Sequence, residues 1–220
     1  MHALLLDLDG TLVDTVYAHT LAWQMALGEA GVVVEGYRLQ RHVGSSGDLI
    51  VRFAQREAGH TLSAEQVEAV HRRHAELFRQ LLPRPRALPG AAGVLRVLRE
   101  SGVPCAIATA SHRPIINASL EALGVGPEDV VTEGKGALRG KPEPDIFLAC
   151  GAQLGKPPGE CIVVGDAIWD HIGARRAGMV SVGVLTGGYG AEELYHAGAA
   201  RVYRDVADLL QHLDELGILL

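Results

Sequence analysis

Short apolar runs alternate with amphipathic stretches from Leu88 to the end of the chain, and this alternation limits the possible folds more than any other feature. It predicts strands over 103–108, 130–131, 161–164, 180–184 and 200–203, and helices over 90–100, 114–123, 142–154, 169–177, 191–197 and 206–216. Strands that alternate with helices favour a doubly wound parallel α/β sheet, with right-handed crossovers that cover both faces. Ligands of such sheets bind at the carboxyl ends of the strands.

The first strand of this sheet is expected at the very start of the chain. Residues 3–6 form a continuous apolar run, typical of a buried central strand, and Asp7, Asp9 and Gly10 follow directly. Side chains two residues apart in an extended segment point the same way, so both carboxylates can address one site. Such close carboxylates need water or a cation, and hard oxygen ligands select Mg²⁺ or a similar ion. The alternative is an acidic turn, which Asp and Gly also favour.

Polar residues follow two further strands of the expected sheet. Thr109, Ala110 and Ser111 end the strand at 103–108, where a hydroxyl and free backbone N–H groups can hold a phosphoryl oxygen. Asp166 ends the strand at 161–164, and Asp170 lies one helical turn later on the same face. Each cluster has a simpler alternative, because Ser111 and Asp166 are also suitable helix caps.

A lysine occupies the loop before the helix expected at 142–154. Lys141 stands between Gly140 and Pro142 in a chain that is otherwise poor in lysine. It can neutralise negative charge beside a phosphate as a point charge. The alternative is a solvated lysine at the start of a helix.

Together these clusters resemble the four motifs of the haloacid dehalogenase-like (HAD) hydrolase superfamily. Residues 7–15, Asp-Leu-Asp-Gly-Thr-Leu-Val-Asp-Thr, are similar to motif I, and Thr109 matches the motif II hydroxyl. Residues 140–145, Gly-Lys-Pro-Glu-Pro-Asp, are similar to motif III, and residues 165–170 to motif IV. The resemblance covers nearly the whole chain and is strongest to the phosphoglycolate phosphatase and β-phosphoglucomutase-like branch.

The resemblance implies a Rossmann-like core and an inserted domain. The core would comprise residues 1–14 and 86–220. Residues 15–85, whose apolar spacing is helical throughout, would form the all-helical C1-type cap. In the cap we expect possible specificity residues at His19, Arg41, His42, Ser45 and Ser46, with a packed or exposed histidine as the alternative for His19.

The resemblance also implies a chemistry. Asp7 would attack the phosphorus atom and become an aspartyl-phosphate, while Asp9 would protonate the leaving group and then activate water. Mg²⁺ would be held by Asp7, the backbone carbonyl of Asp9, and Asp166. The residues implied for phosphate binding are Thr109, Ala110 and Lys141, with support from Gly10, Ser111 and Asp170.

The residues distinguish between several activities found on this kind of site. Asp9 argues against a dehalogenase, which needs no proton donor. The absence of lysine from residues 15–85 argues against phosphonate cleavage through a cap lysine. The loop at 43–47, Val-Gly-Ser-Ser-Gly, lacks the two cations with which mutases of this branch hold a second phosphate, although Arg41 and His42 are near. We therefore expect a phosphatase acting on a small phosphomonoester, with the mutase and a non-catalytic phosphate-binding module as alternatives.

Composition and net charge argue against some classes of binding partner. The formal net charge of −6 gives no general attraction to nucleic acid or anionic membranes. No apolar run approaches the ~20 residues of a membrane span. Three unpaired-looking cysteines and an acidic N-terminus without signal-peptide character indicate a cytoplasmic protein, as a monomer or homodimer, that binds a small phosphorylated metabolite.

Three smaller features receive structural interpretations. His71 and His74 have a spacing compatible with metal binding but are assigned to a solvated helix face. Trp23 is assigned to the core. The run at 187–190, Gly-Gly-Tyr-Gly, is assigned to a turn rather than a nucleotide loop.

Overall fold

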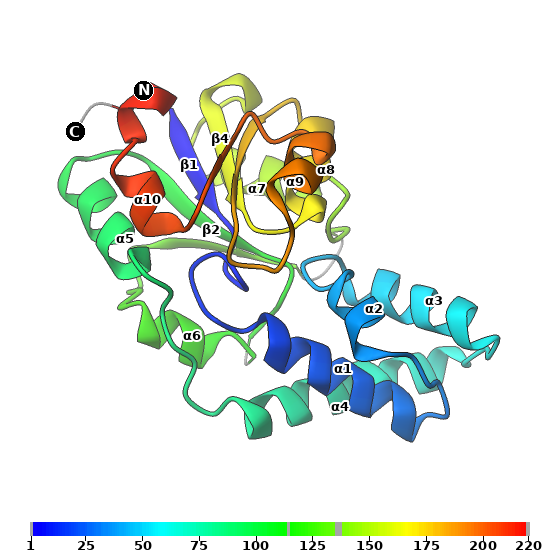
Figure 1. Ribbon diagram of the computed structural model, residues 1–220. Helices are drawn as coiled ribbons and strands as arrows, with labels where there is room; N and C mark the ends of the chain where they lie inside the picture. Colours follow the sequence, from blue (N-terminus) through cyan, green and yellow to red (C-terminus); the bar gives the residue numbers. More distant parts are fainter. Residues whose placement is uncertain (1, 114, 135–137, 219–220) are drawn as a thin grey trace.

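Six parallel strands form one sheet at the centre of the computed structural model, which describes residues 2–113, 115–134 and 138–218 (Figure 1). The strand order is β3-β2-β1-β4-β5-β6. The strands are β1 (Ala3–Leu6), β2 (Cys105–Thr109), β3 (Val130–Glu133), β4 (Cys161–Gly165), β5 (Val180–Val184) and β6 (Arg201–Tyr203). Every pairing is parallel, which confirms the predicted doubly wound α/β fold.

Helices cover both faces of the sheet (Figure 1). They are α5 (Ala91–Glu100), α6 (Asn117–Ala122), α7 (Asp145–Gln153), α8 (Ile168–Arg176), α9 (Ala191–Ala197) and α10 (Val206–Leu210), with 3-10 turns at Pro158–Glu160 and Leu213–Leu216. Alternate residues of β1 point to opposite faces of the sheet. Leu4 and Leu6 belong to the hydrophobic cluster under α5 and α10, and Leu5 belongs to the hydrophobic cluster under α7 and α8. The central strand is therefore buried on both sides.

Four helices between β1 and α5 have a hydrophobic core of their own. They are α1 (Val16–Glu29), α2 (Gly36–Gln40), α3 (Gly47–Ala58) and α4 (Ala64–Leu81). Residues such as Leu27, Ile50 and Phe78 are buried among these helices rather than against the sheet. The sequence defines α4 sharply, because Ser63 and Gln66 form a capping box at its start. In Figure 1 the four helices lie below the carboxyl ends of the strands.

Several helices are shorter than expected. The helix predicted over 142–154 begins only at Asp145, because the α conformation is disfavoured for Lys141 and Glu143, each of which precedes a proline. The helix predicted over 206–216 is divided into α10 and a 3-10 turn, since His212 leaves the helical conformation with φ −128°. The helix predicted over 114–123 begins at Asn117, and Pro114 lies outside the described residues.

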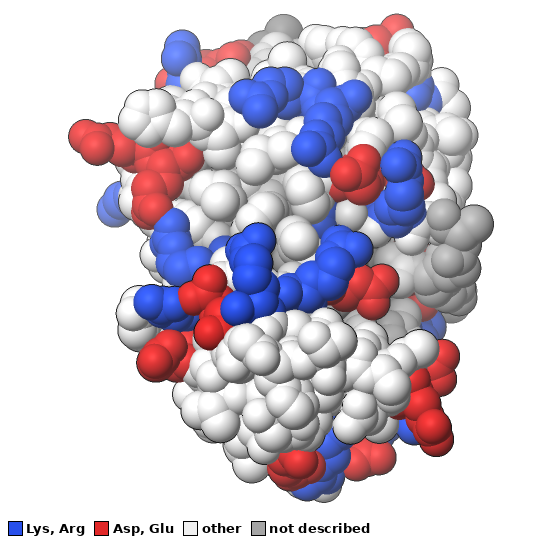
Figure 2. Space-filling model, turned by 90° about the vertical axis from the view of Figure 1, so that its right-hand side faces the viewer, with Lys and Arg blue, Asp and Glu red and all other residues white. Residues whose placement is uncertain are grey.

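Charged side chains on the surface are largely intermixed. Figure 2 shows basic side chains gathered across the middle of one face, with acidic side chains beside them. Among the described arginines, Arg139 pairs with Asp145 at 2.9 Å, and Arg176 with Glu143 at 2.8 Å. Within the described part of the chain, no helix is long and apolar enough to cross a membrane.

Candidate active site

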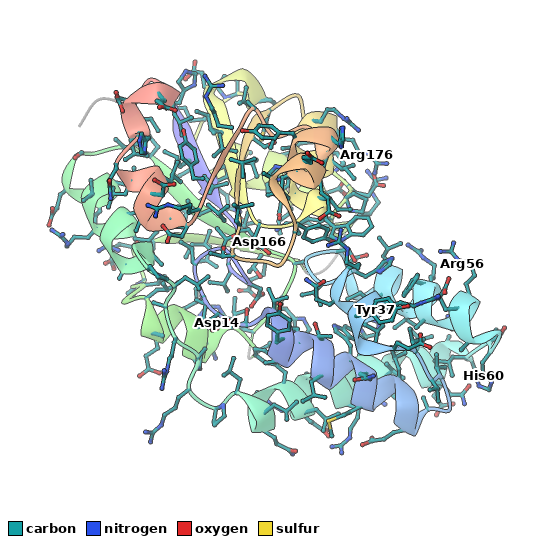
Figure 3. The ribbon with its side chains drawn as sticks, in the orientation of Figure 1. Asp14, Tyr37, Arg56, His60, Asp166 and Arg176 are labelled. Carbon is teal, nitrogen blue, oxygen red and sulfur yellow. The ribbon has the colours of Figure 1, made fainter. Side chains whose placement is uncertain are left out.

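The three central strands deliver their acidic and hydroxyl residues to one edge of the sheet. Leu6 lies beside Ile107 of β2 and Val164 of β4, so the residues that follow these strands come out side by side. The backbone N–H of Asp7 continues the ladder by donating to the Val164 carbonyl at 2.9 Å. Figure 3 shows Asp166 at this edge, between the sheet and the four helices α1–α4. Asp7, Asp9, Thr109 and Asp166 are all buried here.

A fully buried lysine joins two of the carboxylates. Lys141 has 0% exposure, and its Nζ contacts Asp7 and lies 2.7 Å from Oδ1 of Asp170. The other oxygen of Asp170 accepts the Ala167 N–H at 3.1 Å, which fixes the carboxylate at the start of α8. Burial opposes the charge, but Asp170 and Asp7 outweigh it and raise the pKa of Lys141 above its ordinary value. The lysine is therefore a fixed positive charge beside Asp7.

Asp7, Asp166 and Asp170 form an acidic cluster that could hold a metal ion. One oxygen from each lies within 4.8 Å of the others. Burial raises the pKa of Asp7 and of Asp166 above the usual range, so a cation beside them is needed to keep both ionised at neutral pH.

Two glycines, Gly10 and Gly187, lie directly against the carboxylate of Asp166. A Cβ on Gly187 would lie 1.8 Å from Oδ2 of Asp166, and a Cβ on Gly10 would lie 2.5 Å from the same atom. Thr11 donates to its Oδ1 at 2.7 Å. Asp166 is thus held in place with one oxygen in a cradle that only glycines allow, as a metal ligand requires.

Asp9 accepts hydrogen bonds from several side chains. Thr15 lies at 2.8 Å and Ser111 at 3.0 Å, and Thr109 and Nε2 of His19 each lie at 3.3 Å. Burial raises the pKa of Asp9, but His19 and the hydroxyl donors prevail and lower it to about 2. Asp9 is therefore ionised and oriented in the substrate-free site. Thr15 was not among the predicted site residues, although it closes the motif I string.

A second histidine extends this network into the helical segment. Nδ1 of His19 lies 3.0 Å from Nε2 of His74, and the His74 ring stacks on Trp23 with centroids 3.9 Å apart. His74 is only 6% exposed, so its assignment to a solvated helix face was wrong. The cause is the packing of α1 against α4, which spacing along α4 alone does not reveal. His71 is half-buried and lies 3.2 Å from Asp48.

A cavity of about 90 Å³ opens over the two motif I carboxylates. Its walls come from the sheet edge and from α1, α3 and α4, and include Asp7, Asp9, Ala110, Ser111, His19 and Ser45. Trp23, assigned to the core from the sequence, is buried as expected and also lines this cavity.

The remaining cap candidates have other contacts. Ser46 caps α3, and its N–H donates to the Lys141 carbonyl at 2.9 Å. His42 stacks on Phe53 at 3.7 Å. Neither Arg41 nor His42 is among the described residues that line the cavity.

Arg41 instead connects the helical segment to α9 and to the loop before it. Its guanidinium lies 3.8 Å above the Tyr189 ring and pairs with Glu193 of α9. Its carbonyl accepts from Nε1 of Trp169 at 3.1 Å and from the Tyr189 hydroxyl. The run at 187–190 lies in the loop between β5 and α9, and it forms contacts that the sequence did not predict: Gln40 donates to the Gly187 carbonyl at 2.7 Å.

Comparison with known proteins agrees with this geometry. A solved hydrolase from Pseudomonas syringae is 39% identical, with a TM-score of 0.95 and coverage of 98% of this chain and 99% of that one. Hexitol phosphatase A of Escherichia coli is 32% identical over 74% of this chain and 73% of its own length. β-Phosphoglucomutase of Bacillus subtilis is 31% identical over 97% of this chain and 93% of its own. The model of the haloacid dehalogenase-like hydrolase family matches residues 1–178, and the chain belongs to that family.

Proposed function

We propose that the protein is a Mg²⁺-dependent phosphatase that hydrolyses a small phosphomonoester through an aspartyl-phosphate on Asp7. The observation that carries the proposal is the convergence of Asp7 and Asp9 on one cavity, with Lys141 and Asp166 behind them. The name of the E. coli relative, a hexitol phosphatase, supports a phosphorylated metabolite as substrate.

In the first step Asp7 attacks the phosphorus atom, and the leaving alkoxide takes a proton from Asp9. The free enzyme holds Asp9 ionised, with a pKa of about 2. An arriving phosphate dianion raises that pKa by like-charge repulsion, and so favours the protonated form that this step needs. Thr109, which lies 3.3 Å from Asp9, and Lys141, which contacts Asp7, would bind the phosphoryl oxygens.

In the second step Asp9 removes a proton from the water that attacks the phosphorylated Asp7, and phosphate is released. The side chains of Asp7 and Asp166, with the backbone carbonyl of Asp9, would hold Mg²⁺. The ion would shield the negative nucleophile from the negative phosphate.

We also propose that residues 15–85 act as a cap on a core made of residues 1–14 and 86–220. The separate hydrophobic core of α1–α4 and the contacts of Arg41 with Tyr189 and Glu193 support this division. A closed cap excludes water from the phosphoryl transfer. A cytoplasmic location and a monomeric or homodimeric state remain predictions.

The test is phosphate release from a panel of phosphomonoesters, with and without Mg²⁺, for the wild type, Asp7→Asn and Asp14→Asn. Asp14, labelled in Figure 3, is an exposed acid near the end of the same motif and serves as the matched control. We expect Mg²⁺-dependent release that only Asp7→Asn abolishes. Absence of turnover with every ester would favour the phosphate-binding module. Conversion of a sugar 1-phosphate to its 6-phosphate with a bisphosphate primer would favour the mutase.

A further inference from the structure

Among the described residues, the wall of the cavity away from the motif I carboxylates carries no fixed positive charge. Its walls are formed by the loop at 43–47, by Trp23, His71 and His74 of the helical segment, and by His112 and Ile115 after β2. No lysine or arginine is found among the described residues that line it. The leaving group of a substrate with its phosphate on Asp7 would lie against these walls.

The nearest cations of the same segments are paired elsewhere. Arg113, next to His112, lies 2.9 Å from Glu133. Arg41, just before the 43–47 loop, pairs with Glu193 outside the cavity. Lys141 is enclosed between Asp7 and Asp170 and would serve the transferred phosphoryl group. None of these charges is positioned to meet a second anionic group of the substrate.

Two imidazoles of the wall, those of His71 and His74, do not replace the missing charge. Burial lowers the pKa of His71 and lowers that of His74 well below the usual range, so both rings are neutral at pH 7. Asp48 lies 3.2 Å from His71 and adds negative potential on this side. A carboxylate or phosphate placed here would lose its hydration without gaining a counter-ion, which costs several kcal/mol.

Packing around Gly47 also leaves no space for a cationic side chain at this position of the 43–47 loop. A Cβ on Gly47 would lie 2.6 Å from Cε1 of His71 and 3.2 Å from the Trp23 ring. The two rings therefore occupy the space that a longer side chain at this position would need. What they offer instead is ring surface and neutral hydrogen-bonding nitrogens.

The wall is polar enough to favour hydroxyl groups. Ser45 lines it, and its Oγ donates to the His42 carbonyl at 2.7 Å, which leaves the oxygen lone pairs for a substrate hydroxyl. Neutral imidazoles both donate and accept, as a hydroxyl does.

We infer that the leaving group is a small, uncharged polyhydroxy group, so that polyol and sugar monophosphates are preferred over esters that carry a carboxylate or a second phosphate. This inference rests on the proposed function. Asp7, Asp9 and Lys141 would contact only the phosphoryl group, which all candidate substrates share. Discrimination between substrates therefore depends on the wall around the leaving group.

Paired esters, in which a neutral hydroxyl of one member is replaced by a carboxylate or a second phosphate in the other, test the inference. The pairs are 2-hydroxyethyl phosphate against 2-phosphoglycolate, glycerol 3-phosphate against 3-phosphoglycerate, and fructose 1-phosphate against fructose 1,6-bisphosphate. We expect kcat/KM to be at least about tenfold higher for the neutral member of each pair. Equal or higher kcat/KM for the charged members would overturn the inference but leave the phosphatase intact. Hydrolysis of none, with p-nitrophenyl phosphate also inert, would overturn the proposed function itself.

A charge introduced at the wall provides a second test. His112 is exposed and lines the cavity, so His112→Lys adds a cation there, and His112→Gln is the neutral control. We expect the ratio of kcat/KM for 2-phosphoglycolate to that for 2-hydroxyethyl phosphate to rise by about tenfold in His112→Lys and to change little in His112→Gln. The ratio compares two esters on one variant, so a general loss of activity does not affect it. An unchanged ratio in both variants would contradict the inference.

Discussion

Replacement of Lys141 by methionine removes the only positive partner that the described structure gives to the buried carboxylates Asp7 and Asp170. Lys141 and Asp170 are both 0% exposed, and their charged atoms lie 2.7 Å apart. Removing one partner of such a pair leaves an uncompensated buried charge and costs about 3–5 kcal/mol. For a chain of this length that loss lowers the melting temperature by about 6–20 °C. We therefore expect Lys141→Met to be strongly destabilised in metal-free buffer.

Lys156→Met is the matched control, because Lys156 pairs with Glu160, four residues along the chain, at 2.7 Å near the surface. An exposed pair of this kind contributes about 0–1 kcal/mol. The assay is urea and thermal unfolding of both variants without metal, together with Asp170→Asn alone and Asp170→Asn combined with Lys141→Met. Removal of the Asp170 charge relieves the unpaired state, so the double variant should lose less than the sum of the single losses. Equal stabilities for Lys141→Met and Lys156→Met would refute the reasoning.

Three further predictions concern the metal cradle, the cap and pH. Gly187→Ala places a Cβ against Asp166 and should weaken Mg²⁺ activation by about 10–100-fold. The control Gly159→Ala, whose Cβ meets nothing within 4 Å, should leave Mg²⁺ activation unchanged when the activity of both variants is titrated with Mg²⁺. Arg41→Ala removes the contacts with Tyr189 and Glu193 and should raise KM several-fold relative to Arg56→Ala at the far end of the helical segment (Figure 3), in steady-state kinetics. Burial raises the pKa of Asp7 to about 8, so the metal-free native state binds more protons than the unfolded chain between about pH 4 and 8. The free energy of unfolding, measured by urea titration, should therefore fall as the pH rises from about 4 to 8. Added Mg²⁺ should reduce that fall.

The sheet and the motif residues were predictable because their signals are local. A buried strand followed at once by Asp7 and Asp9, or by Asp166, contains both the strand and the position of the acids at its carboxyl end. The parallel order of the strands then brings these ends together without further information.

Contacts between segments far apart in the sequence were not predictable in the same way. The burial of His74 depends on the packing of α1 against α4, and the fit of Gly187 around Asp166 depends on where β5 places its following loop. Arg41 lies close in sequence to the cavity loop, yet its side chain contacts Tyr189 and Glu193. Such partners follow from tertiary packing, which residue spacing does not encode.

The most direct test of the account is to trap the phosphorylated residue. The enzyme is mixed with a hydrolysed ester and Mg²⁺, quenched in the steady state and reduced with borohydride, which converts an aspartyl-phosphate to homoserine. Peptide mass spectrometry then locates the modified position. We predict homoserine at position 7, dependent on substrate and absent from Asp7→Asn. Full turnover with no modification at Asp7, or with modification of another residue, would contradict the assignment of Asp7 as the nucleophile.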